Sequence, residues 1–218
     1  MTRYWPILLV LLAVGAGALT FFAQQPRPPA EQPRLALLSS LPLLFGEEFA
    51  LDLPKVPAIS RIEQTYSITP ISIADTASLE GQTRLLMAHP RAQPAEVLVE
   101  LDAWVRRGGR VVLLADPWLK WEGSRALGDR TRPPPDFADT GLLAHWGLRM
   151  TADDADEGTF HATDKRCTVI NGGFIARCRV GRGSASVIGD ADFVMMEGKD
   201  ADRRLDQMIA ELSRADNR

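Results

Sequence analysis

The chain has 218 residues, of which 45% are hydrophobic and 24% charged, a balance that allows one sizeable buried core. Its formal net charge of −3 argues against a nucleic-acid-binding protein, because such proteins normally carry a basic surface. Its 2 cysteines are too few for a disulfide framework or a four-cysteine zinc site.

The first element is an apolar segment at the N-terminus. Residues 4–23 carry no charge, and about twenty helical residues rise roughly 30 Å, which matches the hydrocarbon layer of a membrane. Tyr4 and Trp5 stand at one end, where amphipathic rings prefer the membrane interface. We expect residues 1–23 to form a transmembrane anchor. Cleavage as a signal peptide after Ala18 or Ala23 is the alternative.

The segment that follows is rich in proline. Residues 24–33 contain four prolines, a composition that predicts an extended linker, either a stalk or a disordered tether. A short N-terminal tail and a large downstream domain favour an orientation with the domain outside the cytoplasm. Residues 34–214 are therefore expected to form one periplasmic α/β domain.

The early part of this domain contains two strand patterns separated by a short helix. Leu35–Leu38 is an apolar run, and Pro57–Gln64 has helical spacing with Ile59 and Ile62 on one side. Ser67–Ile73 alternates apolar and polar residues but is interrupted by Pro70. Because proline cannot donate a ladder hydrogen bond, this strand is expected at a sheet edge or split in two.

A strand–helix–strand unit forms the centre of the domain. Leu85–Ala88 is an apolar run, and residues 97–105 place their apolar side chains on one helical face. Gly108-Gly109 ends this helix, and Val111–Ala115 is long and apolar enough for a strand buried on both faces. The unit predicts parallel strands with a right-handed crossover.

The elements after this unit are shorter. A long loop covers residues 118–136, and the remaining predicted elements are a helix over 142–146 capped by Asp139 or Thr140, a strand over 148–151, a strand over 184–188 and a helix over 202–213.

A β-hairpin is predicted for residues 165–180, with a turn at Asn171-Gly172-Gly173. If Gly172-Gly173 form the two-residue loop, Cys167 lies opposite Cys178, at a distance that a disulfide can bridge. Using Asn171-Gly172 instead would place Cys167 opposite Ala176. We predict the Cys167–Cys178 disulfide, which requires an oxidising compartment; two buried thiols in a cytosolic domain are the alternative.

Candidate site residues lie where the predicted parallel strands end, because ligands of open α/β sheets bind beyond those ends. They could surround one crevice and are Ser39, Ser40, His89, Asp116, Asp190 and Asp192. No nucleophile elbow and no phosphate-binding glycine loop accompanies them, and aspartates in strand-ending turns commonly bond their own backbone. The acidic stretch from Asp153 fails the calcium-loop template, so neither a metal nor a cofactor is expected.

Trp118 and Trp121 in the long loop are candidates for contact with a partner protein, with packing back onto the sheet as the alternative.

Several segments together resemble a known family. LLMAHP at 85–90, LDAWVRRGG at 101–109 and RVVLLADP at 110–117 resemble the auxiliary domain of ABC-type transport systems of the gliding-motility kind. RLALLSSLPL at 34–43 and GRGSASVIGDADFV at 181–194 fall where that family has similar segments, so the resemblance covers most of residues 34–195.

The resemblance implies a class I glutamine-amidotransferase-like fold without the catalytic cysteine, anchored in the membrane beside permease and ATPase subunits. The chain departs from the family in having one hydrophobic span, a shortened domain and a proline-interrupted second strand.

Taken together, these patterns predict a Rossmann-like three-layer α/β domain with a mostly parallel sheet and a β-hairpin insertion, preceded by one transmembrane helix. We expect a single-pass inner-membrane protein that serves as a non-catalytic accessory or binding module of an ABC-type transport system and does not bind nucleic acid. The alternative is a hydrolase or amidotransferase-like enzyme that uses His89, Asp116 and Asp190 at the sheet's carboxyl edge.

Overall fold

The computed structural model describes residues 32–46, 55–126, 128–152 and 157–214. The expected anchor over residues 1–23, most of the linker and most of the acidic stretch from Asp153 therefore lie outside the described residues. Within those ranges, no helix has both the length and the apolar character needed to cross a bilayer.

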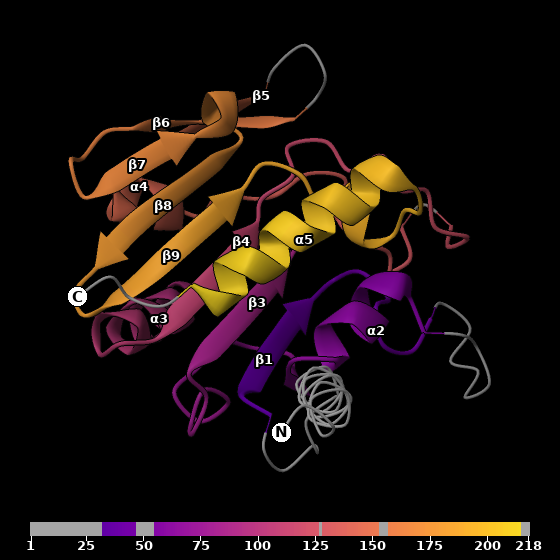
Figure 1. Cartoon of the computed structure of the whole chain (residues 1–218), viewed down its shortest axis with the longest axis horizontal. Coiled ribbons are helices and arrows are strands. Elements are labelled where there is room, and N and C mark those ends of the chain that lie inside the picture. The colour runs from indigo at the N-terminus through magenta and orange to yellow at the C-terminus, as the bar shows by residue number, and fades with distance from the viewer. Residues whose placement is uncertain (1–31, 47–54, 127, 153–156, 215–218) are drawn as a thin grey trace, which may run out of the picture.

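A seven-stranded sheet organises the domain, in the order β2-β1-β3-β4-β9-β8-β7 (Figure 1). The first five of these strands are mutually parallel, and β8 and β7 extend the sheet as an antiparallel hairpin. Pro70 lies in β2 at the sheet edge, as its missing N–H predicts. The strands are β1 (Arg34–Ser39), β2 (Ser67–Ile71), β3 (Arg84–Ala88), β4 (Arg110–Leu114), β7 (Cys167–Ile170), β8 (Ile175–Val180) and β9 (Gly183–Ile188).

Helices cover both faces of the sheet and complete the predicted three layers. Successive residues of β4 supply alternate cores: Val111 and Leu113 pack on one side, and Val112 and Leu114 on the other. This two-sided burial explains why the central strands are apolar throughout. The helices α3 (Ala95–Arg106) and α4 (Leu142–Trp146) cover one face, and α2 (Pro57–Glu63) and α5 (Lys199–Ser213) cover the other.

The hairpin has the predicted register. Ile170 pairs with Ile175, Cys167 pairs with Cys178, and a disulfide joins the two cysteines. The turn between the strands is a single 3-10 turn, η1 (Asn171–Gly173). The predicted disulfide is therefore confirmed.

A small second sheet was only half predicted. β5 (Leu148–Ala152) pairs with β6 (Gly158–Ala162), whose sequence offers one large apolar residue, Phe160, and gives no clear strand pattern. The Gly158 N–H donates to the Gly189 carbonyl at 2.6 Å. A Cβ at Gly189 would lie 1.9 Å from the Gly158 carbonyl oxygen, so only glycine allows this approach beside the end of β9.

Candidate functional site

Three carboxylates meet at the carboxyl edge of the sheet. Asp116 follows β4, and Asp190 and Asp192 follow β9; these two strands are parallel neighbours, so the loops that leave them are adjacent. One oxygen of each carboxylate lies within 4.8 Å of those of the other two. All three side chains are buried, with exposed fractions of 2%, 8% and 6% respectively.

Backbone N–H groups occupy two of the carboxylates. Asp116 accepts hydrogen bonds from the N–H groups of Trp118 and Ala191, both at 2.9 Å. Asp192 accepts from the N–H of Lys120 at 3.0 Å and from that of Trp121 at 2.7 Å. These bonds hold the start of the long loop against the segment after β9.

The third carboxylate belongs to an ion-pair chain. Asp190 accepts the N–H of Asp192 at 2.8 Å and pairs with Arg204 of α5. Arg204 also pairs with Glu157 at 2.6 Å, and its guanidinium lies 4.8 Å from the centre of the Phe174 ring. One arginine therefore offsets part of the negative charge of the cluster.

Burial dominates the electrostatics of the cluster. It raises the pKa of Asp116 to about 6, against the two backbone hydrogen bonds, and the charges of Asp192 and Asp190 act in the same direction as burial. Burial also raises the pKa of Asp190, although a backbone hydrogen bond and Arg204 oppose the shift.

The three carboxylates are the residues of this edge that could hold a hard cation such as Mg²⁺ or Ca²⁺, which prefer oxygen ligands. Their oxygens are already engaged by the backbone and by Arg204, so the geometry also serves as a structural brace between two loops.

His89 is not one of the clustered residues, although the charge of Asp192 acts on its ring. It is fully buried, its φ of 46° is in the left-handed region, and Nε2 is 2.8 Å from the carbonyl oxygen of Pro134 in the long loop. Nδ1 has no hydrogen-bond partner among the described residues. Burial lowers the pKa of His89, so the ring favours the neutral form. A fully buried ring cannot reach a substrate in this conformation.

The two serines lie in a different hollow. Ser39 Oγ donates to the carbonyl of Ala88 at 3.1 Å, and Ser40 Oγ donates to the carbonyl of His89. Both serines line a pocket of about 210 Å³, whereas the three aspartates line another of about 200 Å³. The residues expected around one crevice are thus distributed over two hollows and a buried histidine.

The two tryptophans differ. Trp121 packs, partly buried, against the core on the α2 and α5 side, whereas Trp118 is 59% exposed. Both line a third hollow, of about 340 Å³. This hollow shares Pro133 with the serine pocket and Lys120 with the acidic pocket, so one continuous surface covers the carboxyl edge.

Three large apolar side chains stand out of this surface. Phe45 follows β1, Trp118 follows β4 and Met196 follows β9, and they are 57%, 59% and 46% exposed. We call the exposed apolar patch formed by these three residues the carboxyl-edge surface. Sequence reasoning found Trp118 but missed Phe45 and Met196, because a single apolar residue in a loop gives no signal of its exposure. It also missed Arg204, which reads as one more charge on an amphipathic helix.

No family model matches the sequence, and no curated protein matches it either. Among solved structures, the "mmIFT52 N-terminal domain" superposes with a TM-score of 0.56 at 13% identity, covering 84% of this chain and 99% of that one. An exo-β-1,4-mannosidase, Op5Man5 from Opitutaceae bacterium strain TAV5, has a TM-score of 0.41 at 13% identity over 84% of this chain and 35% of its own. The cytoplasmic protein STM1381 from Salmonella typhimurium LT2 has a TM-score of 0.49 at 5% identity, over 83% and 100%. At such identities the likeness to the first structure shows the fold alone.

Proposed function

We propose that this chain is a non-catalytic accessory module of an ABC-type transport system, held at the inner membrane by its N-terminal segment with the α/β domain in the periplasm. The domain docks on an extracytoplasmic surface of the permease subunit through the carboxyl-edge surface. The proposal builds on the family resemblance of residues 34–195 and on the uncharged apolar segment over residues 4–23.

The observation that carries the docking step is the grouping of Phe45, Trp118 and Met196. Each follows a different strand of the parallel part of the sheet, yet all three stand on one continuous surface and are about half exposed or more. Exposed aromatic and methionine side chains are enriched at protein–protein contacts and depleted elsewhere on the surface. An apolar partner surface that removes these side chains from water is therefore the best fit.

Two further features support the proposal. A disulfide joins Cys167 to Cys178, and stable disulfides are characteristic of compartments outside the bacterial cytoplasm. The polar groups of the same edge favour binding over catalysis: the acidic oxygens accept backbone N–H groups, and His89 is enclosed. The hydrolase or amidotransferase-like alternative would require these groups to be released.

The test is co-purification of the full chain with its partners from detergent-solubilised membranes. We expect the wild-type chain to recover permease and ATPase subunits. Replacing Phe45, Trp118 and Met196 together by alanine is expected to reduce that recovery at least tenfold, since aromatic anchors dominate such contacts. Val99→Ala is the control, because Val99 on α3 is 69% exposed and lines none of the three hollows of this edge.

Equal recovery by the triple variant and the control would contradict the docking surface. Absence of any transporter subunit beside the wild-type chain would contradict the accessory role as a whole.

A further inference from the structure

A second surface lies at the opposite, amino edge of the sheet, on the face that α5 covers only in part. Figure 1 shows β7 and β8 without a helix over the side that faces the viewer. In this region six arginines line a groove of about 750 Å³. We call it the arginine groove; its arginines are Arg110, Arg166, Arg177, Arg179, Arg182 and Arg214.

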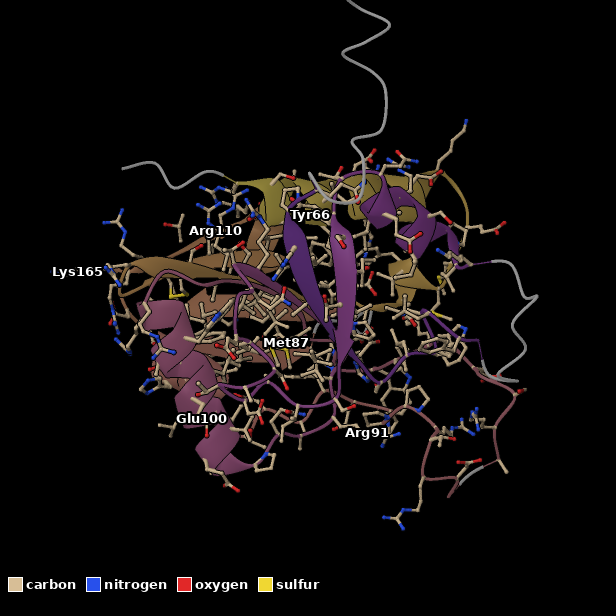
Figure 2. All side chains as sticks on the ribbon, turned by 90° about the horizontal axis from the view of Figure 1, so that it is seen from below. Tyr66, Met87, Arg91, Glu100, Arg110 and Lys165 are labelled. Carbon is tan, nitrogen blue, oxygen red and sulfur yellow. A yellow bond between two sulfur atoms is a disulfide. The ribbon has the colours of Figure 1, made fainter. Side chains whose placement is uncertain are left out.

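The strand register builds this groove. The Arg179 N–H donates to the Arg166 carbonyl at 3.0 Å, Arg179 pairs with Ser184, and Ser184 pairs with Arg110, which makes one row across β4, β9 and β8 to the residue before β7. The next row on the same face pairs Arg177 with Ser186. The small serine side chains of β9 form the floor of the groove, and the longer arginine side chains of the neighbouring strands surround it. Figure 2 shows side chains that end in nitrogen gathered near Arg110.

The groove carries a large excess of positive charge in a chain whose net charge is −3. Among the residues that the structure describes, Glu211 is the one acidic residue that lines it. This carboxylate is already satisfied by Arg177, at 3.0 and 3.1 Å, and by Ser186 at 2.7 Å. Arg179 and Arg182 are exposed and make no ion pair within the described residues. Two guanidinium groups are therefore available to an anion.

Phosphate is the anion that fits this lining best. The planar guanidinium presents donors in a fork that matches phosphate oxygens, and several forks around one groove can hold a phosphodiester from more than one side. The serine hydroxyls on the floor add further donors. The remaining question is which phosphate-bearing molecule meets this surface.

The path of the chain favours membrane lipids as the phosphate-bearing molecules that meet the groove. β1 begins at Arg34, on the same edge as Arg110 and only two strands away, about 10 Å at the usual strand spacing. The Gln32 side chain donates to the Glu63 carbonyl at the end of α2 at 3.0 Å, so the chain enters on the face that α2 and α5 cover. The proline-rich linker of ten residues spans about 31 Å in the polyproline II form and at most about 36 Å when fully extended. A tether that reaches a bilayer would therefore keep this edge close to it.

We propose that the arginine groove binds the headgroups of anionic phospholipids and orients the domain on the membrane. This inference rests on the tether of the proposed function. It places the carboxyl-edge surface on the side away from the bilayer, where it meets the extracytoplasmic part of the permease.

The test uses the full chain purified in an uncharged detergent and titrated calorimetrically with short-chain phosphatidylglycerol, short-chain phosphatidylcholine, inorganic phosphate and a DNA oligonucleotide. We expect saturable binding of phosphatidylglycerol, weakened at least tenfold by 0.5 M salt, and none of phosphatidylcholine. The double variant Arg179→Glu/Arg182→Glu is expected to lose at least tenfold in affinity. Because both side chains are exposed and make no ion pair within the described part of the chain, it should keep the wild-type unfolding temperature.

The matched control is Arg130→Glu/Arg149→Glu, which changes the net charge equally at two exposed arginines outside the groove. An equal loss in the control, or equal binding of the two lipids, would overturn the proposal. Tighter binding of inorganic phosphate or of DNA than of phosphatidylglycerol would overturn the lipid assignment. Lipid binding is measured here without any transporter subunit, so its failure is distinguishable from failure of the co-purification experiment.

Discussion

The side chain of Asp116 is buried, and burial disfavours its charged form. The folded-state pKa of about 6 lies above the ordinary value of 3.8. Because the folded state binds the proton more tightly, the stabilisation from protonating Asp116 is fully present below about pH 4 and is lost as the pH rises through 6. The difference between the two pKa values corresponds to about 3 kcal/mol.

Asp116→Asn should remove this slope. We expect the stability of the wild type relative to the variant to fall by up to about 3 kcal/mol between pH 4 and pH 8. Comparing urea unfolding of the two proteins across this range cancels the slope of opposite sign that His89, whose pKa is lowered by burial, contributes to both. A difference in unfolding free energy that does not vary with pH would show that the pKa of Asp116 is not raised in the folded state.

The hydrogen-bond partners of individual residues were the least predictable feature from the sequence. The positions of Asp116, Asp190 and Asp192 after strand-like runs were readable, and so was their meeting at one edge. Which groups they bind was not, because the donors are backbone N–H groups of loops whose shape no local pattern specifies. The same reason hid the enclosure of His89, whose bond to Pro134 spans 45 positions of the sequence.

At the scale of elements, the long loop after β4 is held by a side chain from the segment after β9. Asp192 is the N-terminal residue of the 3-10 turn η2 (Asp192–Val194), and it binds two successive N–H groups of the loop. A loop of this length has little secondary structure of its own to restrain it. Its position therefore depends on bonds such as those made by this carboxylate, by Asp116 and between His89 and Pro134.

Asp192→Ala should loosen the loop. We expect a loss of about 2 kcal/mol in unfolding free energy, since hydrogen bonds to a charged acceptor contribute about 1.5–3 kcal/mol each and the variant also relieves repulsion within the cluster. Native trypsin digestion should become faster at Lys120 and Arg125. Asp200→Ala serves as control, because its side chain is 84% exposed. Cleavage rates equal to the control would mean that Asp192 does not hold the loop.

Elements were predictable where burial is two-sided or periodic. The apolar runs over β1, β3 and β4 and the helical spacing of α3 and α5 follow directly from packing in a three-layer fold. β6 was missed because it pairs only with β5 and contributes mainly Phe160 to the core. The exposure of loop residues such as Phe45 depends on neighbours distant in sequence, so the carboxyl-edge surface emerged only from the fold.

At the scale of the whole molecule, the parallel sheet separates two surfaces of different character. The amino edge carries the entry of the chain and the arginine groove, and the carboxyl edge carries the exposed apolar residues. A strand of about six residues spans roughly 20 Å, so the two proposed contacts do not compete for the same area. A domain of this kind can lie on a charged bilayer and still present its apolar side to a protein.

Both proposed contacts require the domain to lie outside the cytoplasm. The redox state of the two hairpin cysteines tests this requirement. We expect the full chain, recovered from cells and denatured without a reductant, to resist thiol alkylation. After reduction it should take up two labels. Cys167→Ser should take up one label without reductant. Reduction is expected to lower the unfolding free energy by about 3 kcal/mol, since a short closed loop restricts the unfolded chain by this amount. Two free thiols in cells would place the domain in the cytosol and remove the basis for a periplasmic partner.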